Sequence, residues 1–378
     1  MKRTVLAIPF VVAMSAACVE APELGESMGA VMDGDGNLCP KLGCSSNSAF
    51  LGPTEFHELE WTGANANFEG FKLVGLTKLV NGTRLNYRPA IVNNTQLVGQ
   101  TLRFNLNSGF YWATVLQGAD LIDAELQIDG PGPHNPDYAI RITGMHAQHL
   151  WQPRYPGDTA PEYINTYRLE WYDPNDGVIN SGTTNLCVNP PNRTDGEGQQ
   201  NDAVFEAILF TGDRYDVNHK WVTATTPAAA GTWFNIGCAG GVLWKLALNR
   251  HTYATRGTTT TTLAQRQAML KMYTSDVCDT GEAFTVTGTP LAWASTTGLT
   301  SGPIAVNTYE ARWNETGAIC MTTHRLNRTP DDMDGDETYQ RPDQIHPACQ
   351  TVSRRLPVCG PTHTNFYLVT ASPALADP

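Results

Sequence analysis

Apolar and polar residues alternate along much of the chain from residue 50 onward, with the period of two that is typical of half-buried β-strands. The alternation is clearest at residues 102–106, 124–128, 138–142 and 167–171. Clusters of Gly, Pro, Asn and Asp separate such segments, as at 129–133 and 173–177, and these residue types favour turns. The pattern therefore predicts many short antiparallel strands, each with its apolar side chains toward a core.

Three segments depart from this alternation. Residues 204–210 are apolar on both sides except at Glu206, which predicts a central strand with two buried faces. Residues 242–248 carry apolar side chains at helical spacing, and a second helix is expected to begin after Thr262, because Gln265 completes a capping box with it. The apolar face of this second helix would consist of Leu263, Met269, Leu270 and Tyr273.

The elements together predict one mainly β domain, a β-rich α+β fold, over residues 51–370, with a small helical insertion near 240–275. The threonine run 258–262 is expected to be an exposed loop, and residues 304–313 are the best strand candidate beyond it. Residues 18–50 contain little to bury and are expected to form a flexible tether. No repeat of about 20–50 residues stands out.

The first 17 residues have the three parts of a secretion signal. A basic start is followed by an apolar run and by the small residues 15–17, and Cys18 comes next. In one route these residues are a bacterial lipobox and Cys18 is acylated, although Ser15 stands where a lipobox usually carries an aliphatic residue. In the other, an ordinary signal peptidase cuts near Ala17. The lipoprotein route is favoured because it accounts for an odd cysteine, and it predicts an outer-membrane or cell-surface location, with secretion as the alternative.

Charge distinguishes between classes of partner. The chain carries 25 basic and 37 acidic residues, a formal net charge of −12, and becomes more negative once Lys2 and Arg3 leave with the leader. A surface of that sign repels phosphate backbones, so nucleic acid is not expected as a partner. The same net charge argues against electrostatic adhesion to anionic lipid, which leaves the N-terminal lipid as the expected contact with a membrane.

Cysteine content indicates an oxidising compartment. Of the nine cysteines, Cys18 follows the leader and the other eight are expected to form four disulfides. A preference for local closure predicts a sequential pairing, which is one of about 105 possible arrangements. The predicted pairs are Cys39–Cys44, Cys187–Cys238, Cys278–Cys320 and Cys349–Cys359.

Residues 205–321 resemble the ADYC-domain family, secreted proteins found mostly in myxobacteria. The resemblance rests on ILFTGDRYD at 208–216, WFNIGCAG at 233–240, LAQRQAMLKM at 263–272, and EARW at 310–313 with Cys320. The motif that gives the family its name occurs as Ser275-Asp276-Val277-Cys278, so two of its four positions differ. The resemblance implies secretion and structural cysteines, and it implies no activity. Asp276 beside Cys278 is expected to satisfy turn amides at a helix end.

Two acidic runs are candidates for a structural calcium ion. Asp332, Asp334 and Asp336 alternate along one run, and Asp33, Asp35 and Asn37 along the other. Neither run continues as an EF-hand, so solvated turns are the expected state and no cofactor is required. His146 and His149 lie three apart without a third zinc ligand, and His57-Glu58 starts like a zincin helix but lacks its second histidine. These histidines are expected to be surface or packing residues.

No catalytic motif stands out. The chain contains no G-x-S-x-G elbow, P-loop or dinucleotide fingerprint, and Asp123 and Glu125 share a strand face that should be solvated. The sequence does not decide whether residues far apart in the chain come together as a catalytic triad. Phe110-Tyr111-Trp112, with Trp151 and Tyr155, could form an aromatic platform for a glycan or peptide, although core packing is the commoner use of such residues.

These observations favour an exported, lipid-anchored structural or binding module over an enzyme. The alternative is a secreted hydrolase with a non-local active site. An enzyme should show a concave site with titratable groups of perturbed pKa, whereas a binding module should show an exposed aromatic or flat polar patch.

Overall fold

The computed structural model describes about half of the chain. The described residues are 49–51, 54–131, 136–150, 163–175, 185–187, 206–215, 222–223, 232–239, 241–252, 255–256, 259–275, 292–295, 310–322 and 356–371. The expected leader, Cys18, residues 18–48 of the expected tether, both acidic runs, Asp276, Cys278, Trp151 and Tyr155 lie outside them. The predictions made for those residues therefore stay predictions. The last two residues of the expected tether, Ala49 and Phe50, belong to a strand, so the tether prediction is wrong at that end.

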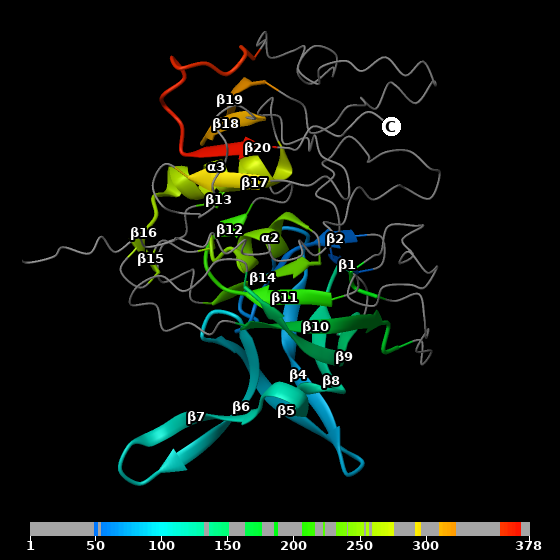
Figure 1. The fold of residues 1–378 in the computed structure, drawn as a ribbon. Helices are drawn as coiled ribbons and strands as arrows, with labels where there is room; N and C mark the ends of the chain where they lie inside the picture. The colour runs from blue at the N-terminus through cyan, green and yellow to red at the C-terminus, as the bar shows by residue number, and fades with distance from the viewer. Residues whose placement is uncertain are drawn as a thin grey trace, which may run out of the picture.

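A ten-stranded antiparallel sheet dominates the fold (Figure 1), in the order β3-β14-β11-β10-β9-β8-β4-β5-β6-β7. Its strands are β3 (Glu58–Glu60), β4 (Lys72–Val80), β5 (Thr83–Val92), β6 (Gln96–Asn105), β7 (Gly109–Leu116), β8 (Ala124–Asp129), β9 (Tyr138–His149), β10 (Tyr163–Tyr172), β11 (Glu206–Phe210) and β14 (Trp233–Cys238). A 3₁₀ turn, η1 (Gly118–Leu121), connects β7 to β8. This sheet confirms the predicted mainly β class.

The sheet curls so that the first part of β6 packs back against β10 and β11. The backbone N–H of Leu97 donates to the hydroxyl of Tyr167 at 2.9 Å, and the N–H of Thr211 donates to the carbonyl of Asn94 at 2.8 Å. Leu97, Tyr167 and Leu209 belong to the same buried core inside the curl. The outer parts of the β4–β5 and β6–β7 hairpins extend away from this core, at the end of the molecule opposite β18–β20 (Figure 1).

A smaller four-stranded sheet, ordered β17-β20-β18-β19, lies on the other side of two helices (Figure 1). Its strands are β17 (Ala292–Ser295), β18 (Ala311–Asn314), β19 (Gly317–Met321) and β20 (Leu368–Ala371), and the helices are α2 (Val242–Leu248) and α3 (Leu263–Thr274). Three two-stranded pairs complete the described elements: β1 (Ala49–Leu51) with β2 (Thr54–Phe56), β12 (Arg214–Tyr215) with β13 (Val222–Thr223), and β15 (Thr255–Arg256) with β16 (Thr259–Thr260). The helices thus form a layer between the two sheets.

Strand β11 separates the two cores of the molecule. Ala207 and Leu209 face the core inside the curled sheet, whereas Ile208 and Phe210 face a second core built with α2, α3 and β18. All five residues of β11 are buried, which confirms the predicted central strand. Helix α2 approaches closely because β14 has a glycine there: a Cβ on Gly237 would lie 2.8 Å from the backbone N of Trp244.

Both predicted helices are present, although α3 differs in its surroundings. The side chain of Thr262 accepts from Gln265 N and the Gln265 side chain accepts from Thr262 N, so the capping box is formed as expected. The predicted apolar face was wrong in one respect, because Leu263 is exposed while Arg266 and Lys271 are buried. From Arg266 to Thr274 every residue of the helix is buried, since the helix packs against β13, β18, β19, β20 and α2.

Two loop and strand predictions need smaller adjustments. The threonine run contains β16, and Thr261 is buried because its carbonyl and hydroxyl accept from Arg266. Of the strand expected at 304–313, the described part is the start of β18. No described helix has the length and apolar character needed to cross a bilayer.

Candidate binding site

The outer part of the β6–β7 hairpin, residues 100–114, projects from the body of the molecule, and we refer to it as the arm. Its register pairs Leu102 with Trp112 and Phe104 with Phe110. Directly paired residues of antiparallel strands point to the same side, so these four side chains form one apolar face. The rings of Phe104 and Phe110 lie 5.0 Å apart at their centroids. The opposite face carries Arg103 paired with Tyr111, and is therefore more polar.

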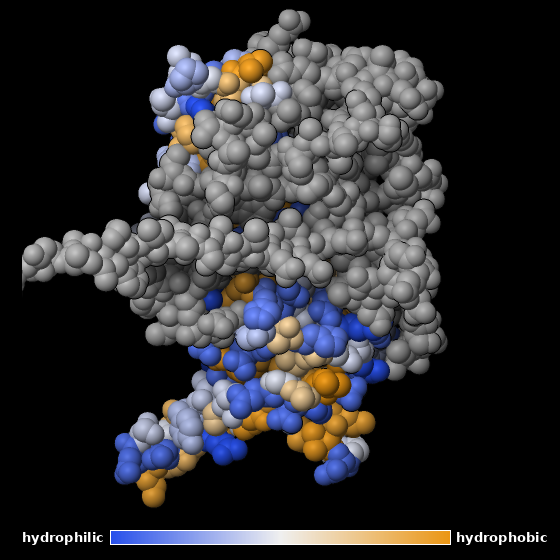
Figure 2. Space-filling view, in the orientation of Figure 1, coloured by the Kyte–Doolittle hydropathy of each residue, from blue (hydrophilic) through white to orange (hydrophobic). Residues whose placement is uncertain are grey.

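Large apolar side chains on the arm and at its tip are in solvent, as the space-filling view shows for this end of the molecule (Figure 2). Their exposed fractions are Leu102 54%, Phe104 60%, Leu106 91%, Phe110 72%, Tyr111 43% and Trp112 45%. Such a group is unusual for a folded protein surface, where contiguous apolar patches commonly mark interaction sites. The sequence stretch 110–112 is thus an exposed platform and is not part of a core.

Arg88 connects the arm to β5. Its guanidinium lies 4.8 Å from the ring centroid of Trp112, within the range of a cation–π contact. Arg88 pairs with Gln100 across β5 and β6, which places it on the apolar face at the base of the arm. The sequence did not indicate this arginine or the pairing of Leu102 and Phe104 with the aromatic run, because both depend on strand register.

A second cluster lies around Glu125 on β8. Glu125 accepts hydrogen bonds from Arg84 at 2.5 Å, from Arg141 Nη2 at 2.8 Å and from Tyr172 at 2.7 Å. Burial by itself raises the pKa of this carboxyl, but these hydrogen bonds outweigh it, so the pKa of Glu125 lies below its ordinary value of 4.5. The expectation that Glu125 lies on a solvated face was wrong, since long side chains from β5, β9 and β10 cover it.

Burial and the hydrogen bond to Glu125 raise the pKa of Tyr172. An ionised carboxylate between two arginines is poorly suited to act as a general acid. The cluster therefore has the features of a structural network on the sheet surface, and Asp123, outside β8 at a left-handed backbone position, takes no part in it.

Other buried carboxylates are also paired. Asp213 receives hydrogen bonds from Arg266, and Glu58 from Arg214. Glu206 on β11 contacts His146 and accepts from Thr166 at 2.5 Å. These partners come from different strands or helices, so the pairs tie elements of the fold together.

The histidines flagged by the sequence are accounted for by contacts within the fold. The Nε2 of His57 lies 3.1 Å from the carbonyl oxygen of Tyr215, and His149 stacks on Tyr163 at 3.9 Å between ring centroids. Across the described segments, no three His, Cys, Asp or Glu side chains are grouped as a metal site.

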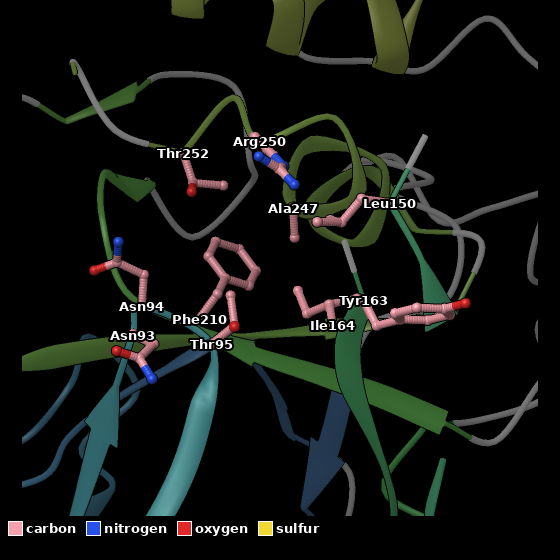
Figure 3. A pocket seen from close by; sticks show the side chains of 10 residues that line it. All are labelled: Asn93, Asn94, Thr95, Leu150, Tyr163, Ile164, Phe210, Ala247, Arg250 and Thr252. Atoms are coloured by element: carbon pink, nitrogen blue, oxygen red, sulfur yellow. The ribbon is translucent and has the colours of Figure 1, made fainter. Parts of the chain in front are cut away.

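A hollow lies between the β5–β6 turn and the end of α2 (Figure 3). It contains about 380 Å³ of empty space, part of it open to solvent. Its walls combine apolar side chains such as Phe210 and Ile164 with the amides of Asn93 and Asn94. Among the described residues that line it, none is a carboxylate or a histidine.

The described disulfides correct the predicted pairing. Cys187–Cys238 is present as expected, but Cys320 pairs with Cys359 across a separation of 39 residues. The predictions Cys278–Cys320 and Cys349–Cys359 are therefore wrong, because tertiary proximity outweighs local closure. Cys39, Cys44, Cys278 and Cys349 lie outside the described residues.

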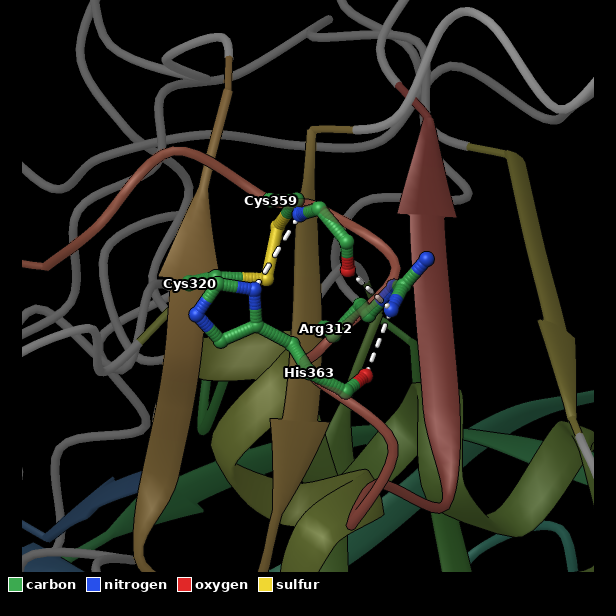
Figure 4. The surroundings of a disulfide bond; sticks show 5 residues. Arg312, Cys320, Cys359 and His363 are labelled. Carbon is green, nitrogen blue, oxygen red and sulfur yellow. Dashed lines mark hydrogen bonds between the residues drawn. A yellow bond between two sulfur atoms is a disulfide. The ribbon is translucent and has the colours of Figure 1, made fainter.

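The Cys320–Cys359 bond is supported by contacts around it (Figure 4). Arg312 donates to the carbonyls of Gly360 and His363, and the N–H of Gly360 donates to His363 Nδ1 at 3.1 Å. Arg312 also lies 4.8 Å from the ring centroid of Phe366. The segment that begins at Cys359 is thus fixed to β19 by a covalent bond and to β18 by hydrogen bonds.

Comparison with protein families decides the relationship that the motifs suggested. The model of the ADYC domain matches residues 118–327, more than half of the chain. The chain belongs to the ADYC domain family. Among the curated proteins and solved structures compared with it, none matches. The ADYC match begins after β7, so the arm precedes the matched region, whereas β8 to β11, α2, α3, β18 and β19 lie inside it.

Proposed function

We propose that this ADYC protein is an exported binding module, held at the cell surface by a lipid on Cys18, that engages its ligand through the arm. The observation that carries the proposal is the exposed face of Leu102, Phe104, Phe110 and Trp112 on a projecting hairpin. The exposed parts of these side chains contribute little to the stability of the fold, whereas their burial against a ligand would stabilise a complex.

The contrast with the buried charged groups supports binding over hydrolysis. The carboxylates of Glu125, Asp213 and Glu58 are each paired with arginine, and the described residues around the hollow beside α2 include neither an acid nor a histidine. The platform and the disulfides, which are typical of oxidising compartments, fit a module that works outside the cytosol.

Binding to cell envelopes tests the proposal. Full-length protein carrying Cys18→Ser, which removes the acylation site, is mixed with isolated envelopes of the producing cells and sedimented. We expect it to sediment with the envelopes, and a variant in which Leu102, Phe104, Phe110 and Trp112 are all changed to Thr should stay in the supernatant. Threonine retains a preference for strands, so the hairpin itself should persist.

The matched control is Phe68→Thr. Phe68 is 82% exposed and lies before the start of β4, away from the Asn81–Gly82 turn that ends that strand. If the arm variant and the control sediment equally with the envelopes, the proposed role of the arm is wrong. Hydrolysis of a chromogenic ester, glycoside or peptide by the wild-type protein would instead favour the enzyme alternative.

A further inference from the structure

Charge is distributed unevenly between the arm region and the rest of the chain. Residues 70–119 contain five basic residues, Lys72, Lys78, Arg84, Arg88 and Arg103, and no acidic residue. All 37 acidic residues of a chain with net charge −12 therefore lie elsewhere. This segment comprises β4 to β7, which are the strands of the two projecting hairpins. Although the chain as a whole is acidic, the strands of these two hairpins carry only positive charge.

Of these cations, Arg88 and Arg103 lie on or beside the arm and are available for a partner, whereas Lys72 lies at the far end of β4. Arg84 is paired with Glu125, and Lys78 donates to the carbonyl of Asp120. Within the described part of the chain, neither Arg88 nor Arg103 forms an ion pair with a carboxylate. Arg88 lies over Trp112, and Arg103 projects from the opposite face of the arm. The arm thus carries positive charge on both faces.

The apolar and charged residues are also ordered along the arm. Leu106 is at the tip, Phe104 and Phe110 form the next apolar rung, and Leu102 and Trp112 follow two residues further back. At about 3.3 Å per residue, Trp112 lies roughly 13 Å behind the tip. Leu and Phe outermost, followed by Tyr and Trp among arginines, match the layers of a membrane from acyl chains to headgroups.

The β4–β5 hairpin presents apolar residues at the same end of the molecule (Figure 2). Leu79 is 61% exposed, and Leu85, also exposed, lies on the strand that returns from the turn. This turn is formed by Asn81 and Gly82, both with positive φ, as a tight two-residue hairpin connection requires. The two hairpin ends carry apolar side chains, and both belong to the segment that contains basic but no acidic residues. Together they offer a partner a broader surface than a single loop would.

We propose that this end of the molecule docks on a bilayer surface with anionic phosphate headgroups. The proposal rests on the proposed binding role of the arm and names its ligand class. Leu106, Phe104 and Phe110 enter the boundary of the acyl chains, Tyr111 and Trp112 lie at the headgroups, and Arg88 and Arg103 bind phosphate. A second copy of this chain fits less well, because two arms of the same charge repel each other.

Vesicle binding tests the proposal, with the Cys18→Ser protein used throughout so that acylation at this position cannot contribute. Sedimentation is measured with vesicles of phosphatidylcholine alone and with vesicles in which about a third of the lipid is phosphatidylglycerol. We expect tighter binding to the anionic vesicles, and weaker binding at about 0.5 M than at about 0.1 M salt. The fourfold Thr variant of the arm should bind at least about 100-fold more weakly, and Phe68→Thr should bind like wild type.

The contribution of positive charge to vesicle binding is tested with a matched pair of substitutions. Arg103→Gln should weaken binding to anionic vesicles about fivefold and leave binding to phosphatidylcholine unchanged. Lys72→Gln removes the same charge at the start of β4, the opposite end of that strand from its hairpin turn, and should have a smaller effect. Equal effects of the two substitutions would show that net charge matters but that the arm does not position it.

The outcomes separate the two proposals. Arm-dependent sedimentation with envelopes but not with vesicles would overturn the lipid ligand and leave the binding role intact, with a glycan or protein as ligand. Wild-type dimers that the fourfold variant loses on gel filtration would identify a second copy as the occupant and also overturn it. Absence of both vesicle and envelope binding would overturn both proposals.

Discussion

Strands β11 and β7 are both rich in apolar side chains but have opposite environments. Phe210 on β11 is fully buried, with the strand flanked by β10 and β14 and covered by a core on each face. Phe110 on β7 is 72% exposed, on a strand that pairs with β6 at the end of the sheet order. The comparison shows that position in the sheet, more than local composition, decides whether these side chains stabilise the fold or remain available for contacts.

The largest effect is expected from Phe210→Ala. Removing this ring leaves a cavity between β11 and the helix layer, and such changes cost about 3–5 kcal/mol of unfolding free energy. Urea denaturation followed by circular dichroism measures the loss. A loss below about 1 kcal/mol would contradict the two-core arrangement around β11.

The second largest loss of stability is expected from removal of the disulfide between β19 and the segment before β20. Replacing Cys320 and Cys359 together by Ala is expected to lower the free energy of unfolding by about 2–4 kcal/mol, since the bond restricts the unfolded chain. Non-reducing peptide mapping of the wild type checks the pairing itself. A peptide that joins Cys278 to Cys320 would restore the sequential pattern and contradict the structure.

Disruption of the hydrogen-bond network around Glu125 should lower the free energy of unfolding by a smaller amount, which depends on pH. The folded-state pKa of Glu125 lies below the ordinary value of 4.5, so the ionised carboxylate stabilises the fold above that pH and loses this contribution as the pH falls through the folded-state pKa. Glu125→Gln should cost about 1–3 kcal/mol at neutral pH. The difference from wild type should shrink below pH 4.5, as measured by urea titrations across the acid range. A difference that stays constant would show that the charge of Glu125 is unimportant.

The smallest effect is expected from Phe110→Ala, the counterpart of Phe210→Ala on the arm. Its ring contacts Phe104 but is mostly in solvent, so the free energy of unfolding should change by less than about 1 kcal/mol. The same urea denaturation provides the measurement. A loss as large as that of Phe210→Ala would mean that the arm packs against the body in solution.

Local signals predicted the elements well. The Thr262–Gln265 capping box located the start of α3, and the double-sided apolar run located β11 as a central strand. Each signal spans only a few consecutive residues, so no knowledge of distant contacts is needed. The same holds for the alternation that predicted β8, β9 and β10.

Contacts between residues far apart in the chain explain why some predictions from the sequence were wrong. Glu125 alternates with apolar residues and was expected in solvent, but Arg84 and Arg141, from β5 and β9, enclose it. Arg266 lay outside the predicted apolar face of its helix, yet it is buried and pairs with Asp213, which is 53 positions away. For the candidate site, the aromatic run was visible in the sequence, whereas its joint face with Leu102 and Phe104 required the register. The absence of acidic residues over 70–119 was a signal in the sequence that net charge hid.

The bond between Cys320 and Cys359 has a consequence for proteolysis. A single cut anywhere between these residues divides the chain, but the two fragments stay joined through sulfur. The C-terminal piece carries β20, which pairs with β18 and β17, so the nicked molecule would retain its small sheet. Damage of this kind would show on a gel as two bands after reduction and as one before it. A protein built in this way can survive a cleavage that would remove the terminal strand of an unlinked chain.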